Sequence, residues 1–213
     1  MNLLNLPNEL LHMIRELIDP RDLLAHVCYL RLCPRTHACY APHATPPKFW
    51  RKLLRASGLG LSLIEFDSER ECKLVGIECA MHAWSCSDPA CGMAKFEENP
   101  VTPQEASGGV RGKIKTNTIF SRLSFNNNFP SIRASDEERS ARMKRCAFIR
   151  QEAPGWSTAD LLGNHPIAQR SFATFPALTD MRILNIDECH WDRHVRNVAG
   201  ITVHDFLLTL SET

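Results

Sequence analysis

The chain begins with LLNLPNELL (residues 3–11), continues into DPRDLL (residues 19–24) and carries FWRKLL at residues 49–54. Each stretch places leucines beside residues that start or stop helices. Pro7 suits the first turn of a helix, where its missing N–H is not needed, and Glu9 favours the positive end of the helix dipole. The sequence therefore predicts a first helix that begins near residue 7.

Apolar residues recur along these stretches at the spacing of an amphipathic helix. In the first helix they are Leu10, Leu11, Ile14, Leu17 and Ile18. The residue before a proline is disfavoured in a helix, so Asp19-Pro20 should end this run and cap a second helix. The apolar residues of that helix, which Pro34 should end, are Leu23, Leu24, Val27, Cys28 and Leu30. A proline-rich loop then leads to a third helix, which contains Phe49, Trp50, Leu53 and Leu54 and ends at Gly58.

In order and spacing, the pattern LPxELLxxI, then DPRDLL, then a helix centred on Trp50 resembles the F-box family. The resemblance implies a three-helix docking module over residues 1–58 that binds a Skp-type adaptor. Through the adaptor, such a module attaches a substrate receptor to the cullin scaffold of a ubiquitin ligase. The loop from Cys33 to Pro47 is longer than in a compact F-box. The alternative is a three-helix fragment of a larger core that has no partner.

The resemblance also indicates which side chains face the adaptor. The positions that match the family's prominent apolar residues are Leu6, Pro7, Leu10, Ile14, Leu23, Leu24 and Trp50.

The composition and net charge argue against several classes of protein. The 213 residues are 44% hydrophobic and 23% charged, with a net charge of +1, which predicts one or two small domains. The expected helices, with a strand near the C-terminus, predict a fold of α+β type that is mainly helical. The near-zero charge argues against a nucleic-acid partner, since phosphate binding needs clustered Lys and Arg. No apolar run approaches the ~20 residues that span a bilayer, and no secretory signal begins the chain. A cytoplasmic or nuclear protein is expected.

Nine cysteines are many for such a chain, and in a reducing compartment they should be thiols. Cys28 is expected to be a small buried hydrophobe. Zinc is the ion that grouped thiolates and imidazoles would select, and the candidate ligands are Cys79, His82, Cys86 and Cys91. The two ligand pairs lie only three residues apart, whereas structural zinc sites separate theirs by a dozen or more. The favoured prediction is therefore no metal and no cofactor, with a helix over residues 68–84, capped by Ser68 and Glu71, that buries Cys72, Val75 and Cys79.

The remaining chain divides by composition. Residues 59–96 hold the predicted helix and a cysteine-rich turn, residues 97–116 read as a glycine- and proline-containing loop or linker, and residues 117–213 form a mixed C-terminal module. Within that module, Ser135-Asp136-Glu137-Glu138 should start a charged helix that runs to about Gln151, with basic residues toward its end.

The C-terminal stretch resembles an uncharacterised domain common in mushroom-forming fungi. The shared phrases are Asn164-His165-Pro166, an aromatic-proline pair at Phe175-Pro176, a strand around residues 181–186, Trp191, and GITVHDFL at residues 200–207. Thr202 and Asp205 should cap a closing helix whose inward residues are Val203, Phe206, Leu207 and Leu210. The resemblance implies no activity.

Three function classes follow. The leading one is a substrate-receptor subunit of a ubiquitin ligase, with an unknown protein substrate and no catalytic residue of its own. The second is an F-box-like scaffold outside any ligase. The third is a thiol enzyme, for which Cys86 or Cys91 would need His82 as base and Asp88 to orient it. The sequence contains no Walker loop, dinucleotide fingerprint, nucleophile elbow or HExxH motif, so an enzyme is not expected.

Overall fold

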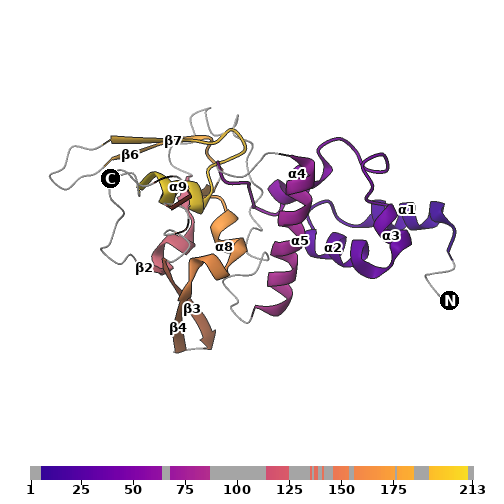
Figure 1. The fold of residues 1–213 in the computed structure, drawn as a ribbon, viewed down its shortest axis with the longest axis horizontal. Coiled ribbons are helices and arrows are strands. Elements are labelled where there is room, and N and C mark those ends of the chain that lie inside the picture. The colour runs from indigo at the N-terminus through magenta and orange to yellow at the C-terminus, as the bar shows by residue number, and fades with distance from the viewer. Residues whose placement is uncertain are drawn as a thin grey trace.

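A computed structural model describes residues 6–63, 68–86, 114–124, 135, 137–138, 141, 146–153, 156–175, 177–184 and 192–210. It shows a mainly helical α+β protein. In Figure 1 the helices α1 to α3 lie on one side of α5, α4 overlaps the upper part of α5, and the strands lie with α8 and α9 on the other side. Among the described residues, no helix combines the length and the apolar character needed to cross a membrane.

The three helices predicted at the N-terminus are present as α1 (Asn8–Leu17), α2 (Leu23–Leu32) and α4 (Phe49–Ala56). Gly58 follows α4 with a φ of +74°, the left-handed conformation that glycine adopts without strain. The structure adds a short helix, α3 (Pro34–Ala38), in the segment that was expected to be a loop. Cys33 and Thr36 exchange the bonds of a capping box at its start, which explains how Pro34 begins a helix as well as ending one.

Two local predictions were wrong. The N-cap of α2 is Asp22, whose Oδ1 accepts a hydrogen bond from the Ala25 N–H, rather than the Asp19-Pro20 pair. Asp19 instead accepts from the Arg21 N–H and closes the turn between the two helices. Cys28 is exposed, because the buried side of α2 runs through Leu23, Val27 and Leu30 and Cys28 lies off that line.

The predicted helix at residues 68–84 is confirmed as α5 (Glu69–Ser85), with Ser68 Oγ accepting from the Glu71 N–H. As expected, α5 buries Cys72, Val75 and Cys79. The first core cluster contains these residues together with apolar residues of α1, α2 and α4, and Ile167 from α8 (Pro166–Arg170). The core therefore continues across residue 58, where the first domain boundary was placed.

A close helix crossing sets the packing of α5. A Cβ added at Gly76 would lie 3.2 Å from the Leu23 side chain and 3.5 Å from Trp50, so the absence of a side chain there lets α2 and α4 approach the α5 backbone. The first turn of α4 is also tied to α5, since the Trp50 N–H donates to Glu69 Oε1 at 2.5 Å.

Beyond α5 the chain forms small antiparallel sheets. β1 (Lys115–Thr116) pairs with β5 (Thr174–Phe175), and β6 (Asp180–Leu184) pairs with β7 (Asp192–Arg196). β3 (Ala147–Ala153) lies between β2 (Leu123–Ser124) and β4 (Trp156–Leu161). Short 3-10 helices, η3 (Thr118–Arg122) and η4 (Leu162–Asn164), precede β2 and α8. β6 confirms the predicted strand from Met181 to Leu184; Ile186, Trp191 and most of the loop at residues 97–116 lie outside the described residues.

The predicted charged helix is right at its start and wrong at its end. Ser135 and Glu138 exchange the two bonds of a capping box. From Ala147, however, the chain is extended and pairs with β4, with Ala147 opposite Leu161. Pairing with two neighbouring strands satisfies the backbone of this segment, and this tertiary context overrides its local helical preference.

A buried carboxylate joins two segments that lie far apart in the sequence. Asp205 lies in the first turn of α9 (Val203–Leu210) and forms the predicted cap with Thr202: its N–H donates to Thr202 Oγ1, and its Oδ2 accepts from the Thr202 N–H. The same carboxylate accepts bonds from Ser62 Oγ, the Leu63 N–H and Asn197 Nδ2, at 2.7–2.8 Å. The capping residue is therefore also the link between the segment after α4 and the C-terminal helix.

We expect Asp205→Ala to lower the free energy of unfolding by about 3 kcal/mol or more, because four donors lose their buried acceptor at once. Urea unfolding followed by circular dichroism measures this loss. The matched control is Asp180→Ala, which removes a half-exposed carboxylate and should cost under about 1 kcal/mol. Equal effects of the two substitutions would contradict the role given to Asp205.

Candidate docking surface

One face of α1 carries a row of exposed apolar side chains. Leu10, Met13 and Leu17 stand one helical turn apart and are 40%, 57% and 84% exposed. The opposite face holds Leu11 and Arg15, which are both buried. Water therefore meets an apolar stripe on a helix whose other side is part of the core, an arrangement typical of a surface that binds a partner.

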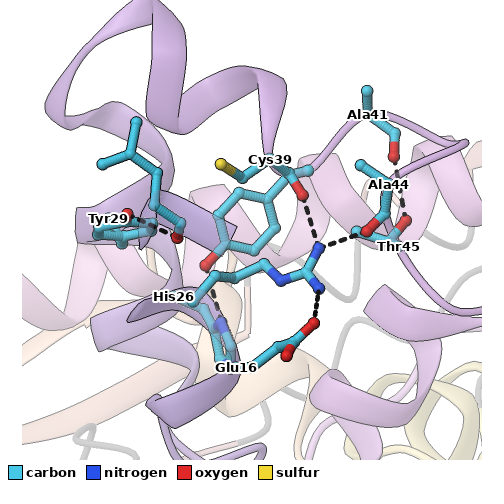
Figure 2. Close-up of polar contacts among 10 residues, drawn as sticks. Glu16, His26, Tyr29, Cys39, Ala41, Ala44 and Thr45 are labelled. Atoms are coloured by element: carbon cyan, nitrogen blue, oxygen red, sulfur yellow. Dashed lines mark hydrogen bonds and ion pairs between the residues drawn. The ribbon is translucent and has the colours of Figure 1, made fainter. Parts of the chain in front are cut away.

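Buried polar contacts fix the position of α1. Arg15 Nη1 donates to the carbonyl oxygen of Cys39 at 2.8 Å and to that of Ala44, while Nη2 lies 3.1 Å from Glu16 Oε1. Figure 2 shows these bonds converging on one guanidinium group, with the Cys39 and Ala44 carbonyls on the segment that follows α3. Because Arg15 is only 7% exposed, it holds α1 to that segment from inside the protein.

A second group of contacts joins α2 to α1 and to the segment after α3. The Tyr29 hydroxyl donates to the Leu11 carbonyl at 2.9 Å, and the Tyr40 hydroxyl lies 2.8 Å from His26 Nδ1 (Figure 2). Burial lowers the pKa of His26 from its usual 6.5, against the opposing effect of the Asp22 charge. Burial also raises the pKa of Tyr40, so its hydroxyl keeps its proton. The pair is therefore neutral near pH 7.

A separate apolar groove of about 380 Å³ lies between α2 and α5. Its lining residues are Leu24, Val27, Cys28, Arg31, Leu32, Ala80, Met81 and Trp84. Trp84 is 72% exposed and Leu32 56% exposed, so this groove is a second place where large apolar side chains meet solvent. Leu24 is the predicted partner-binding residue that lines it.

The structure separates the predicted partner-binding residues into two groups. Leu6, Ile14 and Leu24 are partly buried and Leu10 is exposed, as is Pro7, the N-cap of α1. Leu23 and Trp50, in contrast, are 1% and 2% exposed and pack in the core around Gly76. The prediction that these two side chains contact a partner directly is corrected: their burial allows them to support the surface but not to form it. Met13 and Leu17 are exposed on α1 and were missed, although their helical spacing from Leu10 was visible in the sequence.

The four predicted zinc ligands are not all brought together by the structure. Cys79 is fully buried in the first core cluster, and Cys91 lies outside the described residues. His82 and Cys86 do come together, and His165 joins them, with the three possible ligand atoms all within 4.8 Å of one another. Sequence reasoning noted His165 only as part of an Asn-His-Pro phrase, because nothing local indicates that α8 packs against the end of α5.

A serine, a histidine and an aspartate meet near α9 without the geometry of a catalytic triad. Ser62 Oγ lies 2.8 Å from both His204 Nδ1 and Asp205 Oδ1. In a triad the carboxylate orients the histidine, whereas here it accepts from the serine and caps a helix. All three residues are buried, so this group is structural.

Comparisons with known protein families, with curated proteins and with solved structures found no match for this chain.

We expect Arg15→Met to lower the free energy of unfolding by about 2–4 kcal/mol, because two buried carbonyls lose a charged donor. Chemical denaturation of the full chain measures this difference. Arg31→Met makes the same substitution at an exposed arginine of α2 and should change stability by less than about 0.5 kcal/mol. If Arg15→Met were equally mild, the guanidinium would not be what holds α1.

Stability should also fall as the pH is lowered below about 6.5, because the unfolded chain protonates His26 there while the folded chain resists protonation. The sign follows from the lowered folded-state pKa: the contribution is complete above the unfolded value and is lost as the pH falls through the folded value. His26→Gln should flatten the decline measured by thermal unfolding between about pH 7 and pH 5. His43→Gln, at an exposed histidine, should leave the decline unchanged, and identical profiles for both variants would contradict the prediction.

Proposed function

We propose that the chain is a substrate-receptor subunit of a cullin-RING ubiquitin ligase that binds a Skp-type adaptor through residues 6–58. The observation that carries the proposal is the exposed row of Leu10, Met13 and Leu17 on α1, directly after the LP pair of the F-box-like motif. On this proposal the rest of the chain presents a protein target, and the chain carries out no chemistry itself.

The way α1 is held supports this proposal. A docking helix binds tightly when it is already ordered, because binding then costs little conformational entropy. Arg15 attaches α1 to the segment after α3, and Arg35 donates to the Leu6 carbonyl at 2.5 Å and to Asn8 Oδ1 at 2.7 Å. Both ends of the apolar row are therefore fixed before a partner arrives.

The groove between α2 and α5 is the competing surface for the adaptor. Leu24 lies there, and an apolar groove of this kind accepts a helix from a partner. The row on α1 is favoured because four of the family-matched positions, Leu6, Pro7, Leu10 and Ile14, lie on or beside α1.

Binding of the full chain to a purified Skp-type adaptor, measured by calorimetry, tests the proposal. Replacing Leu10, Met13 and Leu17 together by serine should weaken binding by at least about 30-fold, since central apolar residues of an interface contribute about 2 kcal/mol or more. Because the three side chains are exposed, the variant should keep its circular dichroism spectrum.

The matched control replaces Leu32, Met81 and Trp84 of the groove by serine and should change adaptor affinity by less than about threefold, which is under 1 kcal/mol. A wild-type chain that does not bind the adaptor would refute the proposal. Loss of binding only in the groove variant would move the docking surface to α2 and α5. Adaptor binding without recruitment of a cullin would favour the scaffold outside any ligase.

A further inference from the structure

The end of α5 and the start of α8 bring two imidazoles and a thiol to one point. The side chains are His82, Cys86 and His165, and their nearest nitrogen and sulfur atoms all lie within 4.8 Å of one another. The rings of His82 and His165 meet edge to face, with centroids 5.3 Å apart. His165 is 1% exposed, while His82 and Cys86 are partly exposed. The cluster therefore lies at the protein surface, with His165 on its buried side.

The position of the first two residues follows from helix geometry. His82 and Cys86 are four residues apart, and side chains at that spacing lie on one face of a helix. Cys86 is the C-cap of α5, and its N–H donates to the His82 carbonyl at 2.8 Å. This bond keeps the last turn closed, so the imidazole and the thiol stay one turn apart.

The third residue is held from a distant part of the chain. His165 precedes Pro166, the first residue of α8, and its own N–H donates to the Leu162 carbonyl at 2.9 Å. Arg170 of α8 pairs with Glu78 of α5 at 3.1 Å. Glu78 lies one turn before His82, so this ion pair fixes α8 on the same face of α5 that carries His82 and Cys86.

We propose that His82, Cys86 and His165 bind one zinc ion. A thiolate with two imidazoles is a ligand set that zinc accepts, at about 2.3 Å to sulfur and about 2.0 Å to nitrogen. Tetrahedral angles at these bond lengths place the ligand atoms about 3.3–3.5 Å apart. The three atoms therefore need to move by only about 1 Å, which side-chain rotation supplies, and a water molecule takes the fourth position.

The carboxylate of Asp160 contacts one of the proposed ligands. Its Oδ2 lies 3.2 Å from His165 Nε2, and its Oδ1 accepts from Asn164 Nδ2 and from the Leu161 N–H. A carboxylate that orients a ligating imidazole is a common support for bound metal. With the Cys86 thiolate, it also balances the two positive charges of zinc.

The alternative use of this cluster is a reactive thiol, with Cys86 activated by a histidine that Asp160 orients. Two imidazoles beside one thiol favour the metal, because a base needs only one of them while zinc uses both. The site would tie the end of α5 to the start of α8, and so link the helical part to the sheet-containing part.

The test uses the full chain, stripped with a chelator under reducing conditions and titrated with Co²⁺, a spectroscopic substitute for zinc. We expect one metal per chain, with a thiolate-to-cobalt charge-transfer band and strong visible bands of four-coordinate cobalt, both displaced by Zn²⁺. We also expect Zn²⁺ to protect Cys86 from alkylation, which mass spectrometry of the wild-type chain detects without any variant. Absence of these bands from folded protein would overturn the proposal, as would rapid alkylation of Cys86 with Zn²⁺ present.

Variants identify the ligands. Cys86→Ser and His82→Gln should each abolish the charge-transfer band or weaken Co²⁺ binding by more than about tenfold, whereas Cys28→Ser and His43→Gln, at exposed positions, should not. Cys79→Ala should keep the band, because Cys79 lies in the core. A band that survives in Cys86→Ser, or is lost in Cys79→Ala with the fold retained, would refute this ligand set.

Asp160→Asn tests the supporting carboxylate. Zinc affinity should fall by about 10- to 100-fold while the stoichiometry stays at one per chain. Asp180→Asn, which alters a carboxylate paired with His194 and Arg196, should leave the affinity unchanged. Unchanged affinity in Asp160→Asn would remove Asp160 from the site, and zinc binding lost equally in both variants would overturn the assignment.

Discussion

The close packing of α5 against its neighbours is the constraint on which the other parts of the fold depend. Gly76 lets Leu23 of α2 and Trp50 of α4 approach the helix backbone, and Cys72, Val75, Cys79 and Ala80 fill the space around this crossing. Ile167 of α8 enters the same core. Buried apolar area is the main favourable term in folding, so this one helix stabilises α2, α4 and α8 together.

The proposed docking surface depends on polar contacts within the α1–α3 region. Arg15 is an expensive residue to bury, and two main-chain carbonyls and Glu16 compensate its charge and its donors. These contacts fix the rotation of α1 about its axis. With Arg15 and Leu11 held inside, the other face, which carries Leu10, Met13 and Leu17, points outward. His26 and Tyr40 add a neutral pair that is sensitive to acid.

The histidine-cysteine cluster and Asp205 lie at two of the places where distant segments meet. Asp205 joins the chain after α4 to α9 through hydrogen bonds, and His82, Cys86 and His165 meet where α5 packs on α8. A bound zinc would strengthen the second junction. The helices proposed to bind the adaptor and the segments proposed to present a target would then keep a defined orientation relative to one another.

Local signals in the sequence were enough to predict the position of those helices whose ends are capped by residues nearby in the chain. Pro7, Ser68, Gly58 and the Thr202–Asp205 pair act on residues at most a few positions away, and the helices they delimit lie where they were predicted. The same holds for the start at Ser135. Helical spacing also places Leu10, Met13 and Leu17 on one face of α1, although it does not show that this face is exposed.

Tertiary structure decided everything that depends on which distant segments meet. The strand from Ala147 exists because β4 and β2 offer partners, against a local preference for helix. Leu23 and Trp50 are buried because α5 covers them, and a leucine stripe does not reveal which of its members will be covered. His165 joins His82 and Cys86 only after α8 docks on α5. The physical reason is common to all three: capping and spacing act within about one helical turn, whereas burial and ligand geometry are properties of contacts between residues far apart in the chain.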